Sequence, residues 1–547
     1  MPVTPTYPGI YIQEAPSSTH TITAAPTNVA VFIGYTHPLK TPQSVWGKPV
    51  QIFGFQDYIR QFGGFVRSGA YANAAHDFAD MAAAVNQFFL NGGSQAYVVG
   101  LVPLALKNVA ALGQGANGYV GSQLTIGSVT FAAREITDDK YVMTISVRPN
   151  LPIVSPPSNE TADIMITYGP ATGPGTITES YRRVSLTPML DATTPDPNYI
   201  ATRIGTESNP VSALVTVQSV GSPPFFPAAA ATQSFATSLP SGTSLFQAAD
   251  FNPALQQDSD LDKLPIFNLM VLPGVINTTV LSEALAFCER KRAFLVMDPP
   301  LESTADSPPL RIQDYVGGPD LPKGKNGALY FPYLLSPDPP TGLATNPVTG
   351  KTNEIPPAAT VAGIYAATDV SRGVWKAPAG FQATTTNTTG VVTRGRMTDQ
   401  RQGVLNPLGV NCLRDFPNIG TAVFGARTLV TLTGEQWRYV PVRRMALFLE
   451  QTFYANLGWV VFEPNAEPLW TAITQSINTF MMGLFRQGAF QGTTPSQAFN
   501  VQCNSQTTTQ ADINNGIVNI VVAFAPLKPA EFVIITIAQL AGQTQTS

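Results

Sequence analysis

The segment that most constrains the fold lies at the end of the chain. Residues 526–539 (PLKPAEFVIITIAQ) form a strongly β-prone run. Its large apolar residues alternate between the two faces of an extended strand, with Phe532 and Ile534 on one face and Val533, Ile535 and Ile537 on the other. A strand that is apolar on both faces must be covered on both, and its backbone also needs hydrogen-bond partners. We therefore expect a neighbouring subunit to cover this segment.

The composition indicates a protein surface that is largely covered by other protein. Of the 547 residues, 44% are apolar and only 12% are charged, about half the usual ~25%. A chain of this length divides into several domains, which we expect to be two to four. With a formal net charge of −4, we expect no nucleic-acid binding through a basic surface and no polybasic membrane attachment.

The cysteines and apolar runs exclude several other classes. Cys288, Cys412 and Cys503 lie far apart without a CxxC pair, so we expect neither a disulfide framework nor a zinc cluster. No apolar run approaches the ~18 residues that span a bilayer, so we expect no membrane insertion. The N-terminus lacks the features of a signal peptide, and we expect folding in a reducing compartment without export by the general secretory route.

Changes in composition divide the chain into segments. We expect a multidomain α/β (α+β) protein in which the N- and C-terminal parts build a mixed-sheet core. The expected segments are an extended arm (1–28), the first part of the core (29–104), an inserted β-rich domain that forms a sandwich or barrel (105–260), the second part of the core (261–357), a C-terminal domain (358–528) and a terminal strand arm (529–547).

Periodicity predicts the elements within these segments. Helical spacing of apolar residues predicts helices over 74–90, 279–290, 440–454 and 467–486. Continuous or alternating apolar runs predict core strands over 29–34, 97–99, 267–272 and 293–297, insert strands over 123–132, 141–147, 163–168, 181–186 and 213–220, and late strands over 499–503 and 516–524. Residues 332–357 are rich in Pro, Gly and Asn and predict a long loop.

Two glycine motifs favour an alternative, a nucleotide-binding α/β enzyme. Residues 113–118 have the spacing GxGxxG, with Glu135 at about the distance of a ribose-binding acid. The mechanism needs a helix N-terminus behind the glycines, yet 119–130 predicts a strand. The residues at 350–352 (GKT) lack the leading glycine of a P-loop, as does Gly324-Lys325. We interpret all three as loop residues and expect no cofactor.

Catalytic and metal-binding patterns are weak as well. The chain has three histidines, His20, His37 and His76, and we expect none of them to be a buried base. GxSxG and HExxH are absent. We interpret the carboxylates of the C-terminal part as partners of nearby arginines. We therefore expect no enzyme activity and no metal site; a secreted adhesin is disfavoured by the missing signal peptide.

Several blocks of sequence, in order along the chain, resemble one family. They are YPGIYIQE at 7–14, FFLNGG at 88–93, VAGIYA at 361–366 followed by Asp369 and RGVWKAPA at 372–379, ARTL at 426–429, RYVPVRR at 438–444, WVVFEPN at 459–465, LW at 469–470, GAFQG at 488–492, AF at 498–499 and PAEF at 529–532. This pattern is similar to the sheath proteins of phage tails and contractile injection systems. The likeness covers roughly residues 1–100 and 260–540. Gly100 and Gly380 depart from the family's usual residues.

The resemblance implies which residues form the inter-subunit strand arms and which belong to the family motifs. The strand arms would include Tyr7, Ile10, Tyr11, Ile12, Phe532, Val533, Ile534, Ile535 and Ile537. The family-motif residues are Gly363, Tyr365, Asp369, Arg372, Gly373, Trp375, Arg427, Arg443, Arg444, Phe462, Glu463, Pro464, Asn465, Trp470 and Glu531.

The resemblance also implies a function. Sheath subunits form stacked six-membered rings around an inner tube, and their terminal arms add strands to the sheets of neighbouring copies. Contraction of this lattice drives the tube through a target envelope without a cofactor. The implied partners are further copies, the inner tube protein, and baseplate and terminal cap proteins. Assembly would occur in a bacterial cytoplasm, and the particle could be a phage tail, a bacteriocin or an injection system.

Overall fold

The computed structural model describes residues 20–536, apart from 68–77, 109–112, 116–117, 151–160, 173, 190–192, 223–225, 240–244, 302–310, 320, 346–351, 393–396 and 431–434. The chain divides into two compact units. The core unit comprises residues 26–372 and 378–443, and the C-terminal unit comprises 1–25, 373–377 and 444–547. Both units combine segments that are distant in sequence.

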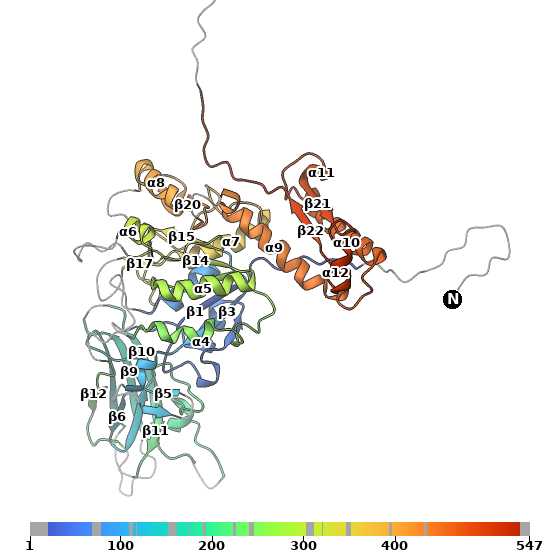
Figure 1. The fold of residues 1–547 in the computed structure, drawn as a ribbon. Helices are drawn as coiled ribbons and strands as arrows, with labels where there is room; N and C mark the ends of the chain where they lie inside the picture. Colours follow the sequence, from blue (N-terminus) through green and yellow to red (C-terminus); the bar gives the residue numbers. More distant parts are fainter. Residues whose placement is uncertain are drawn as a thin grey trace, which may run out of the picture. The chain divides into compact units, whose positions relative to one another are not determined.

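An eight-stranded mixed sheet forms the centre of the core unit (Figure 1). Its order is β2 (Pro49–Ile52), β3 (Ala96–Leu101), β1 (Ala30–Tyr35), β13 (Leu269–Val271), β14 (Phe294–Met297), β15 (Gly327–Phe331), β19 (Val410–Phe416) and β20 (Gly420–Val423). The six inner strands run parallel, while β2 and β20 pair antiparallel at the two edges. Residues 30–101 and 269–423 therefore build one sheet, which confirms the predicted mixed-sheet core.

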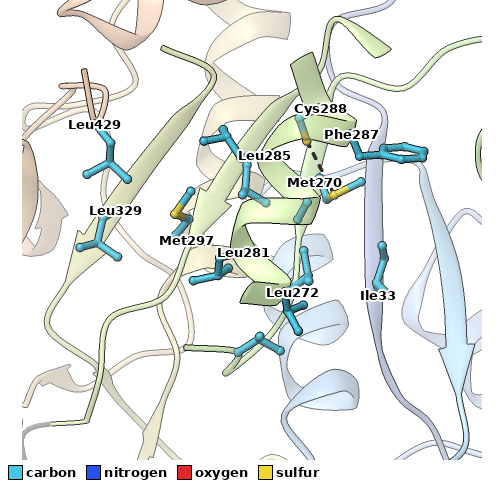
Figure 2. Close-up of a cluster of buried hydrophobic side chains, with 14 of the residues drawn as sticks. Ile33, Met270, Leu272, Leu281, Leu285, Phe287, Cys288, Met297, Leu329 and Leu429 are labelled. Carbon is cyan, nitrogen blue, oxygen red and sulfur yellow. Dashed lines mark hydrogen bonds between the residues drawn. The ribbon is translucent and has the colours of Figure 1, made fainter. Parts of the chain in front are cut away.

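Helices cover both faces of this sheet. Helix α5 (Thr278–Lys291) packs Leu281 and Leu285 against one face, together with Met297 and Leu329 of the strands (Figure 2). Helices α2 (Asp80–Leu90) and α7 (Ala358–Arg372) lie on the other face, where Phe32 meets Phe88 edge to face. Because side chains alternate along a strand, a sheet covered on both sides needs nearly continuous apolar strands, as the sequence has here.

The inserted region forms two antiparallel sheets around a shared apolar core. One sheet has the order β10 (Ile177–Ser185), β9 (Thr161–Pro170), β8 (Tyr141–Pro149) and β12 (Ala231–Ser234), and the other β11 (Val215–Val220), β7 (Val129–Ala133) and β6 (Gln123–Ile126). Phe131, Ile145, Ile166 and Val217 are buried in the same cluster. Alternating burial along β8, with Tyr141, Met143, Ile145 and Val147 inside, is the pattern of a strand with one face on a core.

The predicted loop at 332–357 is only partly correct. It contains β16 (Leu334–Ser336) and β17 (Asn353–Ile355), which pair in a three-stranded sheet with β18 (Gly390–Val391). Strands this short have little signal of their own, because antiparallel pairing to distant residues stabilises them. The remaining helices of the core unit are α1 (Phe55–Phe62), α3 (Ile200–Arg203), α4 (Asn252–Leu255), α6 (Ile312–Gly317) and α8 (Asp399–Leu405).

The C-terminal unit is built on two long helices. Helix α9 (Val440–Asn456) begins in the core unit and lies mostly in the C-terminal unit, and α10 (Glu467–Arg486) follows it. The smaller elements are α11 (Pro495–Ala498), β21 (Phe499–Gln502), α12 (Gln510–Asn514) and β22 (Val521–Phe524). Ile473, Ile477 and Met481 of α10 are fully buried in this unit's core. Within the described residues, no helix combines the length and apolar character needed to cross a membrane.

Candidate inter-subunit surface

The end of the described chain exposes a run of large apolar side chains. After β22 the chain forms a bridge between Pro526 and Phe490, and residues 527–536 then form neither helix nor strand (Figure 1). The exposed fractions are 72% for Phe532, 80% for Val533, 90% for Ile534 and 80% for Ile535. Such a run marks an interaction site rather than ordinary surface. Ile537 lies outside the described residues.

The N-terminal segment is fixed to the same unit. His20 stacks on Trp459 with ring centroids 3.8 Å apart, and Ile22 is buried in the core of the C-terminal unit. The Thr23 amide donates to Asn456 Oδ1 at 3.0 Å, and Asn456 Nδ2 donates to the Thr23 carbonyl at 2.8 Å. The predicted arm residues Tyr7, Ile10, Tyr11 and Ile12 lie outside the described residues. Both ends of the chain thus belong to the C-terminal unit.

This unit also contains a small sheet with open edges. Strands β21 and β22 pair antiparallel, from Phe499 opposite Phe524 to Gln502 opposite Val521. In β21 the side chains of Phe499 and Val501 are buried, while Asn500 and Gln502 are exposed. Among the described residues the sheet has only these two strands. An isolated two-stranded sheet is marginal, so added strands would stabilise it.

Several family-motif residues of α7 have structural roles in the core unit. A Cβ on Gly363 would lie 2.5 Å from the Phe88 carbonyl oxygen, so only glycine allows α2 and α7 to approach this closely. Tyr365 is fully buried and its hydroxyl bonds that of Tyr330. Asp369 is buried too.

The motif residues after α7 stabilise the chain where it leaves the core unit. Arg372 Nη1 donates to Gln382 Oε1 at 3.0 Å. Gly373 has φ +89°, and a Cβ there would lie 2.4 Å from the Trp375 ring. Trp375 packs partly buried against the core of the C-terminal unit. These contacts are local and support the fold.

Two further motif arginines, Arg427 and Arg443, bond backbone and amide groups. Arg427 Nη1 donates to the Asn406 carbonyl at 3.0 Å. Arg443 Nε donates to Asn326 Oδ1 at 2.7 Å, and its guanidinium lies 5.0 Å from the centre of the Trp437 ring. Arg444 is buried in the C-terminal unit.

The motif at 459–465 forms a rigid loop with an exposed tip. Trp470, which is buried, donates from Nε1 to Asn465 Oδ1 at 2.9 Å, and Asn465 Nδ2 donates to the Ile517 carbonyl at 3.0 Å. Between these supports, Phe462 has φ +72° and a fully exposed side chain. Glu463 and Pro464 are exposed, whereas Glu531 near the chain end is half-buried.

One histidine prediction is wrong. His37 is fully buried, and its Nε2 lies 3.0 Å from Glu135 Oε2, while Lys40 Nζ bonds the other carboxylate oxygen. Burial lowers the pKa of His37, so the imidazole is neutral at pH 7. Burial alone would raise the pKa of Glu135, but the charge of Lys40 and the hydrogen bonds from His37 and Lys40 lower it to about 2. Glu135 thus joins the inserted sheets to the core sheet instead of binding a ribose.

A second buried network supports the same junction. Arg67 Nη1 donates to the Tyr141 hydroxyl at 2.5 Å, and Nη2 bonds Asp338. Asn353 Nδ2 donates to the same carboxylate at 3.1 Å. His76 lies outside the described residues, and His20 is exposed.

The nucleotide motifs lack the required structural context. The glycines of 113–118 lie in a hairpin of β4 (Gly113–Gly115) and β5 (Gly118–Val120), and β6 follows instead of a helix. Gly324-Lys325 lies just before β15, and 350–351 lie outside the described residues. In the described part of the chain, no group of three or more His, Cys, Asp or Glu side chains is arranged to hold a metal ion.

Family models identify the chain. The phage tail sheath protein central domain matches residues 260–429, and the phage tail sheath C-terminal domain matches residues 433–539. The chain belongs to the phage tail sheath family. Sheath proteins are structural, so this chain is a structural sheath subunit and not an enzyme. No curated protein matches it significantly.

Solved sheath structures share the fold over nearly the whole chain. The sheath complex of the PVC extracellular contractile injection system in its contracted state is 20% identical, with 98% of both chains covered and a TM-score of 0.55. The helical sheath of the anti-feeding prophage in its contracted state is 22% identical, with 98% of this chain and 100% of that chain covered and a TM-score of 0.55. The sheath tail protein of Desulfitobacterium hafniense is 11% identical, with 95% and 100% covered and a TM-score of 0.51.

Sequence reasoning missed two features of this sheath subunit. Periodicity gave no sign that His37 is buried, because Glu135 is 98 residues away in sequence. Nor does the sequence signal the backbone of Phe462, since a positive φ is expected of Gly, Asn or Asp rather than Phe.

Proposed function

We propose that this sheath subunit assembles into stacked six-membered rings around an inner tube, and that its terminal segments add strands to sheets of neighbouring copies. The observation that carries the proposal is the unpaired, exposed segment 532–535 in the same unit as the two-stranded sheet β21–β22. The added strands supply the hydrogen bonds that both the segment and the sheet edge lack.

The energy of one such contact is small. Burying four large apolar side chains contributes about 6–12 kcal/mol, at ~1.5–3 kcal/mol each. Ordering the backbone of the same four residues costs about 4–8 kcal/mol, at ~1–2 kcal/mol each. One arm alone is therefore marginal. Several arms in a closed ring act together through effective concentration, which makes the assembly durable.

The division into two units suits a lattice that shortens without falling apart. Both chain ends belong to the C-terminal unit, so linked C-terminal units form the continuous mesh, and the core units change their packing. Relaxation of this metastable lattice drives the inner tube through a target envelope, without a cofactor. We further propose assembly in the bacterial cytoplasm as part of a phage tail-like particle, with the inner tube, baseplate and cap proteins as partners. The inserted sheets face outward.

A truncation tests the strand exchange. Deleting residues 532–547 removes the exposed segment, while its described residues contain no helix or strand. We expect the purified full-length chain to form rings or hollow cylinders in negative-stain electron microscopy. The truncated chain should stay monomeric with unchanged far-UV circular dichroism.

A matched pair of variants separates backbone strand pairing from nonspecific hydrophobic association. Val533→Pro removes a backbone donor from the strand, whereas Val533→Thr keeps β propensity with a smaller apolar surface. V533P should block assembly and V533T should retain it. Normal polymers from the truncated chain would refute the terminal-strand mechanism.

A further inference from the structure

The tip of the loop at 458–466 has a conformation that the isolated chain does not favour. Phe462 has φ +72°, a region that bulky residues rarely adopt. Its side chain is fully exposed, and that of Val461 is 62% exposed. Both features are unfavourable in a free subunit, and residues held in this way cluster at contact and switch sites.

The loop is held in place, so Phe462 is presented rigidly. The Val461 amide donates to the Gly458 carbonyl at 3.3 Å, and the Glu463 amide donates to the Val460 carbonyl at 3.2 Å. Asn465 connects the loop to the buried Trp470 and to the Ile517 carbonyl. A loop backbone that is already ordered loses little entropy on binding.

The surroundings of Phe462 indicate what it binds. Glu463 and Glu467 both follow Phe462 in sequence and are exposed, and neither belongs to an ion pair within the described residues. The partner should therefore combine an apolar surface with a positive charge. The C-terminal segment of this chain has that composition, because the exposed Lys528 precedes Phe532–Ile535 by four residues and is likewise outside the ion pairs of the described chain.

The two apolar faces of the C-terminal segment 532–535 also require a second apolar surface to pack against. When a strand joins the β21–β22 sheet, one of its faces packs on the core of the C-terminal unit and the other faces outward, beside the exposed Val521 and Asn500. The segment is apolar on both faces, so strand addition alone leaves one apolar face uncovered. The loop that carries Phe462 is bonded to the segment that leads into this sheet, since Asn465 donates to the Ile517 carbonyl, four residues before β22.

We propose that Phe462 packs on the outward face of the C-terminal segment of a second copy of this chain, with Lys528 of that copy beside Glu463 and Glu467. This inference rests on the proposed strand exchange and adds its second contact.

Cysteine cross-linking tests the contact directly. The native Cys288, Cys412 and Cys503 are buried, so introduced thiols are the reactive ones. A mixture of F462C and I534C subunits, assembled and treated with a mild oxidant, should give a disulfide-linked dimer on a non-reducing gel. V370C, at a side chain of the core unit that is also well exposed, at 74%, is the control and should give no dimer with I534C. Absence of the F462C–I534C dimer in assembled rings overturns the inference.

A second measurement separates this contact from the strand exchange. Phe462→Asn removes the aromatic ring and suits the positive φ, so the melting temperature of the monomer should stay equal or rise. Its critical concentration for assembly should rise about tenfold, as loss of one buried aromatic contact predicts. If the wild type assembles and F462N assembles at the same concentration, Phe462 is not a contact and the strand exchange stands. If the wild type itself stays monomeric, the proposed function fails.

Charge-reversal variants test the proposed pairing of Lys528 with Glu463 and Glu467. K528E and the double variant E463K/E467K should each raise the critical concentration, and combining all three should lower it again. If the effects of K528E and E463K/E467K on the critical concentration simply add in the combined variant, the assigned pairing of these charges is excluded.

Discussion

Removing the charge of Glu135 should release the inserted sheets from the core unit. The Glu135→Gln variant keeps the size of the side chain and can still bond His37, but it leaves the Lys40 ammonium in a largely buried site without its carboxylate. Lys40 and Glu135 expose only 12% and 10% of their side chains. Solvent therefore cannot replace the lost partner.

Two independent arguments give the size of the free-energy loss that Glu135→Gln should cause. Breaking a buried ion pair by removing one partner costs about 3–5 kcal/mol. The lowered pKa of Glu135, from 4.5 to about 2, corresponds to about 3 kcal/mol at 1.36 kcal/mol per pKa unit. We expect a loss of about 3 kcal/mol in the stability of this junction, which makes local opening about 100-fold more frequent.

Hydrogen exchange measured by mass spectrometry resolves this local effect, since unfolding of so large a chain is not a two-state process. Exchange should accelerate in peptides that cover 36–41 and 129–149, and peptides of α10 serve as the internal control. Replacing both partners, as in K40M/E135L, should restore much of the protection because no charge is left unpaired. An acceleration below about fivefold in E135Q would show that the pair contributes little and would refute the reasoning.

The pKa shifts of Glu135 and His37 also predict how the stability of this junction changes with pH. The folded pKa of Glu135 is below its unfolded value, so its contribution is present above pH 4.5 and is lost as the pH falls towards 2. His37 also has a lowered folded pKa, and its contribution declines below its ordinary value of 6.5. Protection of the junction in the wild type should therefore fall on acidification, and the fall between pH 5 and 3 should be smaller in E135Q.

The remaining predictions concern the core unit and the C-terminal unit. Gly363→Ala should destabilise the core unit by about 2 kcal/mol or more because its Cβ would collide with the Phe88 carbonyl. Gly483→Ala in α10, where a Cβ meets nothing within 4 Å, should instead stabilise the helix by about 0.5–1 kcal/mol. Hydrogen exchange of peptides from α7 and α10 measures both changes, and equal effects would contradict the collision. Burial raises the pKa of Asp298 to about 7, although the amides of Ala358 and Gly274 donate to it. Its folded pKa is above the unfolded value, so stability should decline as the pH rises from 4 through 7, and D298N should lack this decline in melting curves across that range.

Local sequence patterns predicted the long helices α5, α9 and α10 accurately, whereas they did not predict α7 (Ala358–Arg372), and α2 begins at Asp80 instead of residue 74. The apolar stripe of 467–486 matches α10 (Glu467–Arg486), and the predicted helix over 279–290 is α5 (Thr278–Lys291). Both depend on contacts between residues three and four apart and on local caps, such as the Asn277 side chain that accepts the Val280 amide. The short strands β16 and β17 escaped prediction because their stability comes from pairing with distant residues.

The sequence by itself determined the α/β class, the β-rich insertion and the unusual apolar segment at 532–535, because each is written in composition or in a period of a few residues. Only the tertiary structure decided the strand order of the central sheet, the burial of His37 beside Glu135 and the exposure of Phe462 at a positive φ. These features depend on contacts between residues far apart in the chain, whose energies no local window contains.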